Sequence, residues 1–238
     1  MTQLLYLTDS YLREFDARVV ASDQARNAVV LDKTAFYPGG GGQPNDVGQL
    51  KIGDRTLTVS RVKRQDGEIS HFVEGDLPPV GAAATAEIDW DRRYQLMRIH
   101  TALHILCGVI WRDYGASVTG GNMEVGHARM DFEFERMRKE LVREIGQKIN
   151  AEVEAARPVK VAVLPRDEAF QIPDLIRTKI NLLPKGILEV RTVEIVGLDL
   201  QADGGTHVAN TSEVGQINIV DYKSKGKINK RLVIELGA

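Results

Sequence analysis

Apolar and polar residues alternate in short runs over the first ninety residues of the chain. Leu57–Val62 and Ile69–Val73 alternate residue by residue, as half-buried strands do. Turn-forming sequences at Asp46–Gly48 and Gln65–Gly67 separate such runs at a spacing typical of small all-β folds. We therefore expect residues 1–90 to form a β-barrel-like domain.

The pattern changes after Pro78-Pro79. Apolar residues then recur every three or four positions, which predicts an amphipathic helix whose start Asp89 or Asp91 can cap. A second helix is predicted over Glu135–Ala155, and Pro158 ends it. The apolar positions of the first helix are Leu96, Ile99, Leu103, Leu106 and Ile110.

Further β-prone runs lie beside these helices, and the last two flank a turn at Ser224–Lys227. Helices beside a mostly antiparallel sheet indicate an α+β fold. We therefore expect the β-barrel-like domain at 1–90 to be followed by an α/β two-layer domain at 91–238. The expected strands of this second domain are Ala128–Phe134, Val159–Leu164, Leu188–Val196, Glu213–Tyr222 and Asn229–Leu236.

Composition narrows the class of protein. Of 238 residues, 43% are hydrophobic and 27% charged, which is typical of a globular protein with a substantial core. A net charge of −2 argues against binding nucleic acid by bulk charge, while specific recognition through a small basic patch remains open. We expect no DNA partner. With one cysteine, Cys107, no internal disulfide can form, and neither a membrane span nor a signal peptide is recognisable. We expect a cytoplasmic protein; its oligomeric state cannot be read from the sequence.

Two short segments carry residues suited to a metal ion. His100 and His104 are four positions apart on the predicted helix, so both imidazoles point the same way. Asp203 and His207 flank a Gly-Gly turn and could complete the coordination. The alternatives are two partly buried histidines beside a core and an ordinary turn with a surface histidine.

A glycine-rich segment at Thr34–Asp46 is a further candidate for binding. Four successive glycines followed by Gln43 expose backbone N–H groups and allow a ligand to approach closely. No Lys-Ser/Thr follows, so the segment is not a P-loop. Taken alone, it could equally be a flexible linker.

Taken together, these segments resemble the AlaX family of free-standing alanyl-tRNA editing proteins, in its medium-sized class. The resemblance covers essentially the whole chain. It rests on Thr34–Asp46, on His100 and His104 after Arg92-Arg93, on Gly204–Val208, and on the ending Lys223–Glu235.

The resemblance implies an editing domain of the threonyl/alanyl-tRNA synthetase type, which binds Zn²⁺ through His100, His104, Asp203 and His207. The implied activity is hydrolysis of mischarged Ser-tRNA(Ala), with Gly-tRNA(Ala) as a further candidate substrate. One departure stands out, because many members of the family have Cys where this chain has Asp203. Asp203 can bind zinc directly, hydrogen-bond to a zinc ligand and so orient it, or act as a catalytic base. Cys107 could replace the missing thiolate, but we interpret it as a buried core residue.

Recognition residues follow from the same resemblance. Thr119 lies on an expected loop after the histidine helix and is the candidate catalytic-site residue that recognises the serine hydroxyl. Alternatively, Thr119 is an ordinary threonine in a turn. Lys223, Lys225 and Lys227 form a basic hairpin suited to phosphates, or else simply a solvated turn. The candidate residues for contacting the tRNA through the glycine-rich segment are Gly39, Gly40, Gly41, Gly42 and Gln43.

Two other functions remain open at this point. The chain could be a tRNA-binding accessory module that has lost hydrolysis, and Asp203 is the residue that favours this alternative. A general zinc hydrolase of small esters or peptides fits less well, because no Glu follows His100 in a His-Glu-x-x-His pattern.

Overall fold

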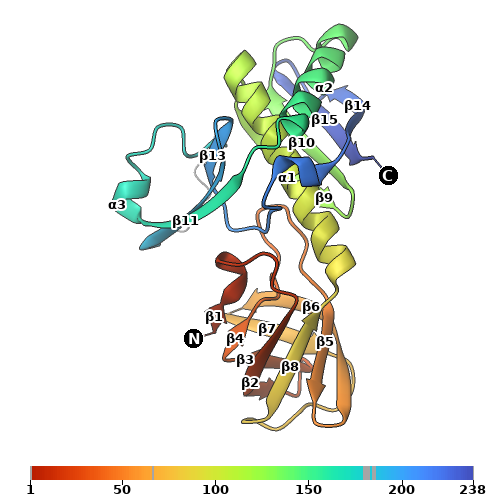
Figure 1. Cartoon of the computed structure of the whole chain (residues 1–238), viewed down its shortest axis with the longest axis vertical. Helices are drawn as coiled ribbons and strands as arrows, with labels where there is room; N and C mark the ends of the chain where they lie inside the picture. The colour runs from red at the N-terminus through yellow and green to blue at the C-terminus, as the bar shows by residue number, and fades with distance from the viewer. Residues whose placement is uncertain (1, 66, 179–182, 184–185, 238) are drawn as a thin grey trace. The chain divides into compact units, whose positions relative to one another are not determined.

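A computed structural model describes residues 2–65, 67–178, 183 and 186–237. The chain divides into two compact units, Met1–Gln95 and Leu96–Ala238 (Figure 1). The division falls inside helix α1 (Trp90–Tyr114), whereas the sequence pattern places the boundary just before that helix. The boundary at residue 90 therefore stays a prediction.

The first unit is a closed six-stranded barrel with strand order β2-β3-β7-β6-β5-β8, as the alternating runs predict. Its core is apolar, with Phe36, Leu50 and Val59 fully buried. Near the start of the chain, Leu5–Leu7 forms a short 3-10 helix. The barrel strands are β2 (Glu14–Asp23), β3 (Ala28–Leu31), β5 (Gly48–Ile52), β6 (Arg55–Gln65), β7 (Glu68–Val73) and β8 (Ala83–Ile88); β1 (Gln3–Leu4) pairs with β4 (Lys33–Thr34).

The second unit contains two antiparallel sheets (Figure 1). One has the order β14-β15-β10-β9 and the other β11-β12-β13. Helix α2 packs on β14, and with α1 it supplies the helical layer of this α+β unit. The remaining elements are β9 (Val118–Glu124), β10 (His127–Glu133), α2 (Lys139–Glu154), β11 (Val159–Pro165), α3 (Arg166–Ala169), β12 (Glu189–Ile195), β13 (Asp199–Ala202), η2 (Thr211–Val214), β14 (Ile217–Ser224) and β15 (Asn229–Leu236).

Three local predictions for this unit need correction. Helix α2 begins at Lys139 rather than at residue 135, because Arg138 is still extended. Strand β14 begins at Ile217 rather than at 213, because Asn210 and Glu213 form a capping box that starts a 3-10 turn. The segment around Thr119 is strand β9 rather than a loop, since it pairs with β10.

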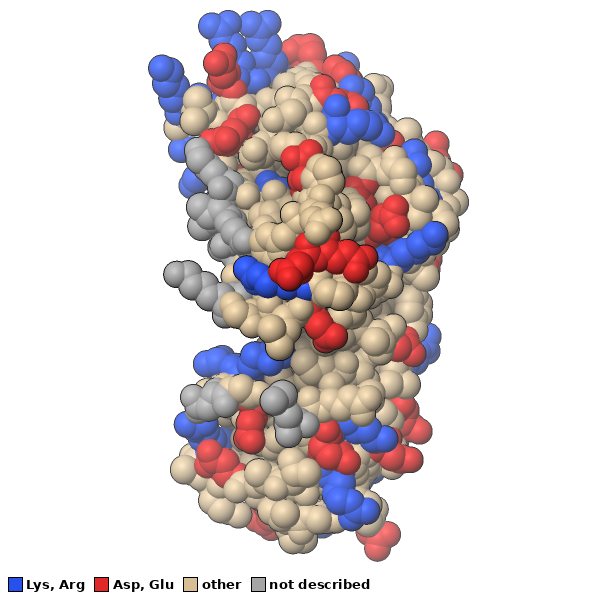
Figure 2. Space-filling model, turned by 90° about the vertical axis from the view of Figure 1, so that its left-hand side faces the viewer, with Lys and Arg blue, Asp and Glu red and all other residues tan. Residues whose placement is uncertain are grey.

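Charged side chains of both signs are interspersed over the face shown in Figure 2, in keeping with the net charge of −2. None of the helices in the described ranges is long and apolar enough to cross a membrane.

Candidate metal centre

Helix α1 supplies the first two side chains of the site. His100 and His104 lie one turn apart, with ring centroids 5.2 Å from each other. Both side chains are buried, with 5% and 6% of each residue exposed. Asp89 caps the start of this helix by accepting a hydrogen bond from the Arg92 N–H, as the sequence predicts.

The chain after β13 supplies the other two side chains. The Asp203 N–H donates to the Arg191 carbonyl of β12, which fixes the backbone. The chain then turns through Gly204-Gly205, and the Gly205 N–H donates to Oδ2 of Asp203 at 2.6 Å. Nε2 of His207 lies 3.1 Å from the same oxygen. The turn thus brings the carboxylate and the imidazole together.

The two pairs meet in one cluster. One ligand atom from each of His100, His104, Asp203 and His207 lies within 4.8 Å of all the others. Nε2 of His100 is 3.5 Å from Oδ1 of Asp203, and the His207 ring is 4.2 Å from that of His100. Ligands on a tetrahedral metal ion with bonds of about 2.1 Å stand about 3.4 Å apart. The donor set therefore fits a metal ion.

The remaining nitrogens of the three imidazoles face fixed partners. Oγ1 of Thr101 lies 3.2 Å from Nδ1 of His207. His100 makes a backbone hydrogen bond with Thr206, and Nδ1 of His104 lies 3.2 Å from Oδ2 of Asp199. Such outer contacts fix ring orientation in metal sites.

Burial sets the protonation of the cluster. It lowers the pKa of His100 to about 4 and that of His207 well below its usual range. Burial acts on His104 in the same sense, but the carboxylates of Asp199 and Asp203 together outweigh it and the pKa of His104 is raised. Burial would raise the pKa of Asp203, yet the surrounding imidazoles outweigh it and the pKa is lowered. His100, His207 and Asp203 are thus in the forms that bind metal at neutral pH.

The glycine-rich segment of the first unit forms a tight loop. All four glycines, Gly39 to Gly42, have positive φ, a conformation that side chains disfavour. The N–H of Gly40 and the N–H of Gln43 each donate to the other's carbonyl, so the tip is a closed turn rather than a flexible linker.

Both ends of this loop are anchored within the first unit, the start by a barrel strand and the end by helix α1. At its start, Oγ1 of Thr34 lies 2.9 Å from Nε2 of His71. At its end, the buried Asp46 carboxylate pairs with Arg93 and accepts the Tyr37 N–H at 2.6 Å.

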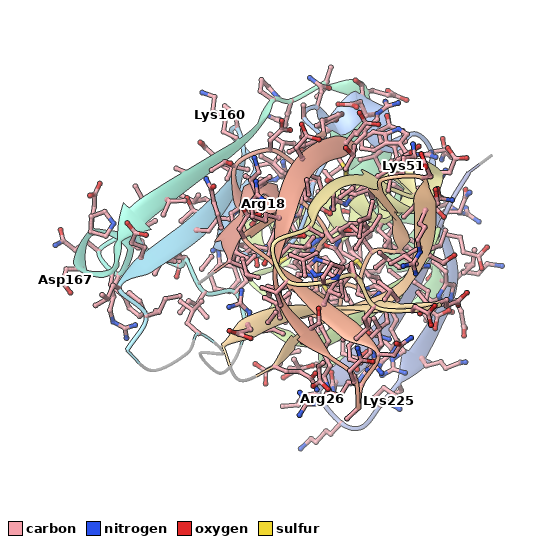
Figure 3. The ribbon with its side chains drawn as sticks, turned by 90° about the horizontal axis from the view of Figure 1, so that it is seen from below. Arg18, Arg26, Lys51, Lys160, Asp167 and Lys225 are labelled. Atoms are coloured by element: carbon pink, nitrogen blue, oxygen red, sulfur yellow. The ribbon has the colours of Figure 1, made fainter. Side chains whose placement is uncertain are left out.

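The basic hairpin has fewer available cations than its sequence suggests. Lys223 pairs with Asp221 at 2.8 Å, and Nζ of Lys230 donates to carbonyls of the turn. Lys225 and Lys227 make no side-chain ion pair within the described residues, and Figure 3 shows Lys225 directed outward.

Two other sequence candidates lie outside the cluster. The Thr119 side chain is exposed on β9, and its hydroxyl donates to Oδ1 of Asn229 at 2.8 Å. Cys107 is buried, burial raises the pKa of its thiol, and it is not among the clustered ligands.

Sequence reasoning missed the outer contacts of the site. Asp199 follows a Gly197 turn that could have been noticed, but nothing in its spacing connects it to His104. Arg177 reaches Asp199 from a segment without helical or strand periodicity.

Two family descriptions match separate parts of the chain. Residues 8–92 match tRNA synthetases class II (A), and residues 190–233 match the threonyl and alanyl tRNA synthetase second additional domain. The second match contains Asp203 and His207.

Whole-chain relatives carry more specific names. Alanyl-tRNA editing protein AlaX-M of Saccharolobus solfataricus is 44% identical over 98% of both chains, and that of Methanosarcina barkeri is 37% identical over 99% of both. Alanine–tRNA ligase of Pyrobaculum aerophilum is 40% identical over 92% of this chain but only 25% of the ligase. With these identities spanning nearly its full length, this chain belongs to the AlaX family of alanyl-tRNA editing proteins.

Proposed function

We propose that this protein edits in trans, hydrolysing the aminoacyl ester of mischarged Ser-tRNA(Ala), with Gly-tRNA(Ala) as a further candidate substrate. As a member of its family it is an aminoacyl-tRNA deacylase. The observation that carries the proposal is the buried cluster of three histidines and Asp203.

Zinc is the metal we propose for this cluster. Three imidazoles and one carboxylate are ligands that zinc accepts in a four-coordinate site. When bound, the ion would supply Lewis acidity to the ester and its attacking water.

Asp203 has two candidate roles in this chemistry. As a ligand it would complete the donor set of the three histidines. As a base it would accept a proton from water while the water oxygen bonds to the ester carbonyl carbon. The bond from that carbon to the ribose oxygen then breaks, and the ribose oxygen takes up the proton. The Gly205 N–H and His207, which both contact Oδ2, hold the carboxylate in place for either role.

Selectivity for serine requires a group that bonds to its hydroxyl. A site built to bond a substrate hydroxyl strongly rejects an analogue that lacks it, here correctly charged alanine. We propose Thr119 for this group. Its hydroxyl donates to Asn229, which leaves its oxygen lone pairs free to accept a hydrogen bond from serine.

For the tRNA itself we propose two contact regions. Lys223, Lys225 and Lys227 would bind phosphates, with the last two contributing most because Lys223 is already paired. The loop at Gly39–Gln43 would approach the tRNA backbone closely, because its glycines carry no side chains.

The test is single-turnover deacylation of Ser-tRNA(Ala) and Ala-tRNA(Ala), with metal content measured on the same protein. We expect loss of serine alone and about one zinc per chain, since the described residues hold one such cluster. His104→Ala should lose both metal and activity. His127→Ala, which removes an exposed histidine on β10 outside the cluster, is the matched control and should retain both.

Two variant results separate the remaining possibilities. If Asp203→Asn loses the metal, Asp203 is a metal ligand. If this variant keeps the metal but hydrolyses Ser-tRNA(Ala) more slowly, Asp203 is the base. Zinc-replete wild-type protein that binds tRNA(Ala) without hydrolysing Ser-tRNA(Ala) would refute the proposal and favour an accessory binding module.

A further inference from the structure

A buried carboxylate stands directly behind one of the candidate ligands. Oδ2 of Asp199, at the start of β13, lies 3.2 Å from Nδ1 of His104. The Asp199 side chain is fully buried and that of His104 is 7% exposed. His104 Nδ1 is a buried nitrogen that makes no hydrogen bond among the described residues, and the Asp199 carboxylate is the acceptor that faces it.

Two further side chains hold this carboxylate in place. Nε2 of Gln201 donates to Oδ2 of Asp199 at 2.6 Å. Nε of Arg177 lies 3.4 Å from Oδ1, and the Arg177 guanidinium is 4.8 Å from the centre of the Trp111 ring. Because burying a polar group without partners is costly, these contacts stabilise the Asp199 side chain at this position.

The backbone of α1 is shaped to let Asp199 approach. Gly108 lies one turn after His104 on the same helix. A Cβ added at Gly108 would lie 2.9 Å from Cβ of Asp199 and 2.9 Å from Cγ of Leu198. Any side chain at Gly108 would therefore move the start of β13 away from the helix.

We propose that Asp199 is a positioning residue that keeps His104 protonated on Nδ1, so that Nε2 is the nitrogen presented to the metal cluster. The inference rests on the metal site proposed above. Neutral imidazole carries one proton, and an acceptor behind Nδ1 keeps the proton on that nitrogen and leaves the Nε2 lone pair available to a metal.

The alternative is that Asp199 only stabilises the fold through Arg177 and Gln201. That role needs no particular proton position on His104. The positioning role and the purely structural role of Asp199 therefore predict different tautomers of the His104 ring and different metal affinities of the variants. They do not differ in stability alone.

The first measurement is the tautomer of His104 by ¹⁵N NMR of the metal-free wild-type protein at alkaline pH, where the ring is neutral. We expect the proton on Nδ1. In Asp199→Asn, whose amide can donate to the ring, we expect a shift toward protonation at Nε2. A wild-type ring protonated on Nε2 would overturn the inference without any variant.

The second measurement is zinc affinity by competition with a chromophoric chelator. Asp199→Asn should bind zinc about 10- to 100-fold more weakly, the usual effect of losing a partner behind a metal ligand. Gly108→Ala leaves every ligand and Asp199 in the chain and should weaken binding in the same direction. Asp131→Asn is the matched control, because Asp131 also pairs with an arginine, Arg231 at 2.7 Å, but in the other sheet.

The outcomes distinguish this inference from the proposed function. Unchanged zinc affinity in both Asp199→Asn and Gly108→Ala, with Ser-tRNA(Ala) still hydrolysed by the wild type, overturns the inference and leaves the function standing. If the tautomer and the losses of zinc affinity are as expected but the wild-type protein does not deacylate Ser-tRNA(Ala), the inference is supported and the proposed function is refuted. A melting temperature measured for each variant identifies those that fail to fold.

Discussion

Acid should destabilise the barrel of the first unit through one buried histidine. His71 is fully buried; its Nδ1 lies 3.2 Å from the Val29 carbonyl and its Nε2 lies 2.9 Å from the Thr34 hydroxyl. A neutral ring satisfies both contacts by donating from Nδ1 and accepting at Nε2. Burial lowers the pKa of His71 to about 4, and the bond to Val29 offsets this only in part.

The magnitude follows from linkage. The unfolded chain takes up a proton at the ordinary histidine pKa of 6.5, whereas the folded barrel resists it until about 4. The stabilisation is thus fully present above pH 6.5 and is lost as the pH falls toward 4. The loss of stability amounts to about 2 kcal/mol by about pH 5 and about 3 kcal/mol once both states are protonated.

The assay compares wild-type protein with His71→Gln, which keeps a polar side chain but cannot titrate. Amide hydrogen exchange in β3 and β7 measures the stability of the barrel separately from that of the second unit. We expect His71→Gln to be less stable at neutral pH but to lose less stability on acidification. Equal acid sensitivity of the two proteins in these strands would show that His71 is not the cause of the acid destabilisation.

Three further predictions concern the loop anchor, the hairpin and the metal. Asp46→Asn should lower the free energy of unfolding by about 3–5 kcal/mol by leaving the Arg93 charge buried and unpaired; a loss close to zero in urea unfolding would contradict this. Lys225→Ala with Lys227→Ala should weaken tRNA binding and reduce its log–log salt slope by about 2, and an unchanged slope would exclude phosphate contacts there. Chelating the metal should lower the melting temperature, by an amount that corresponds to about 4 kcal/mol if the free metal is about 1,000-fold above its dissociation constant; Asp203→Ala should show a smaller shift.

Much of the site could be predicted because it depends on local spacing. His100 and His104 share a face in any helix, and the periodicity of α1 specified that helix. The Gly-Gly turn similarly brings Asp203 and His207 together within one short segment. That the two pairs meet is a hypothesis from their spacing and the family resemblance; in the structure, one ligand atom of each of the four side chains lies within 4.8 Å of the others.

Thr119 shows where such reasoning fails. Its segment contains two glycines and looks like a loop, but pairing with β10 makes it a strand. Strand pairing depends on residues that are distant in the sequence, so the β-propensity of the segment alone could not predict it.

The elements with strong periodicity could therefore be predicted from the amino-acid pattern alone: the alternating strands of the barrel, the long histidine helix, and the turns that contain glycine. Which charged groups are buried together depends instead on how the folded units pack internally. Arg93 with Asp46 and Asp199 with His104 join residues 47 and 95 positions apart, respectively. Burying a charge without its partner is costly, and the partner is brought there by the packing of the whole unit rather than by neighbouring sequence.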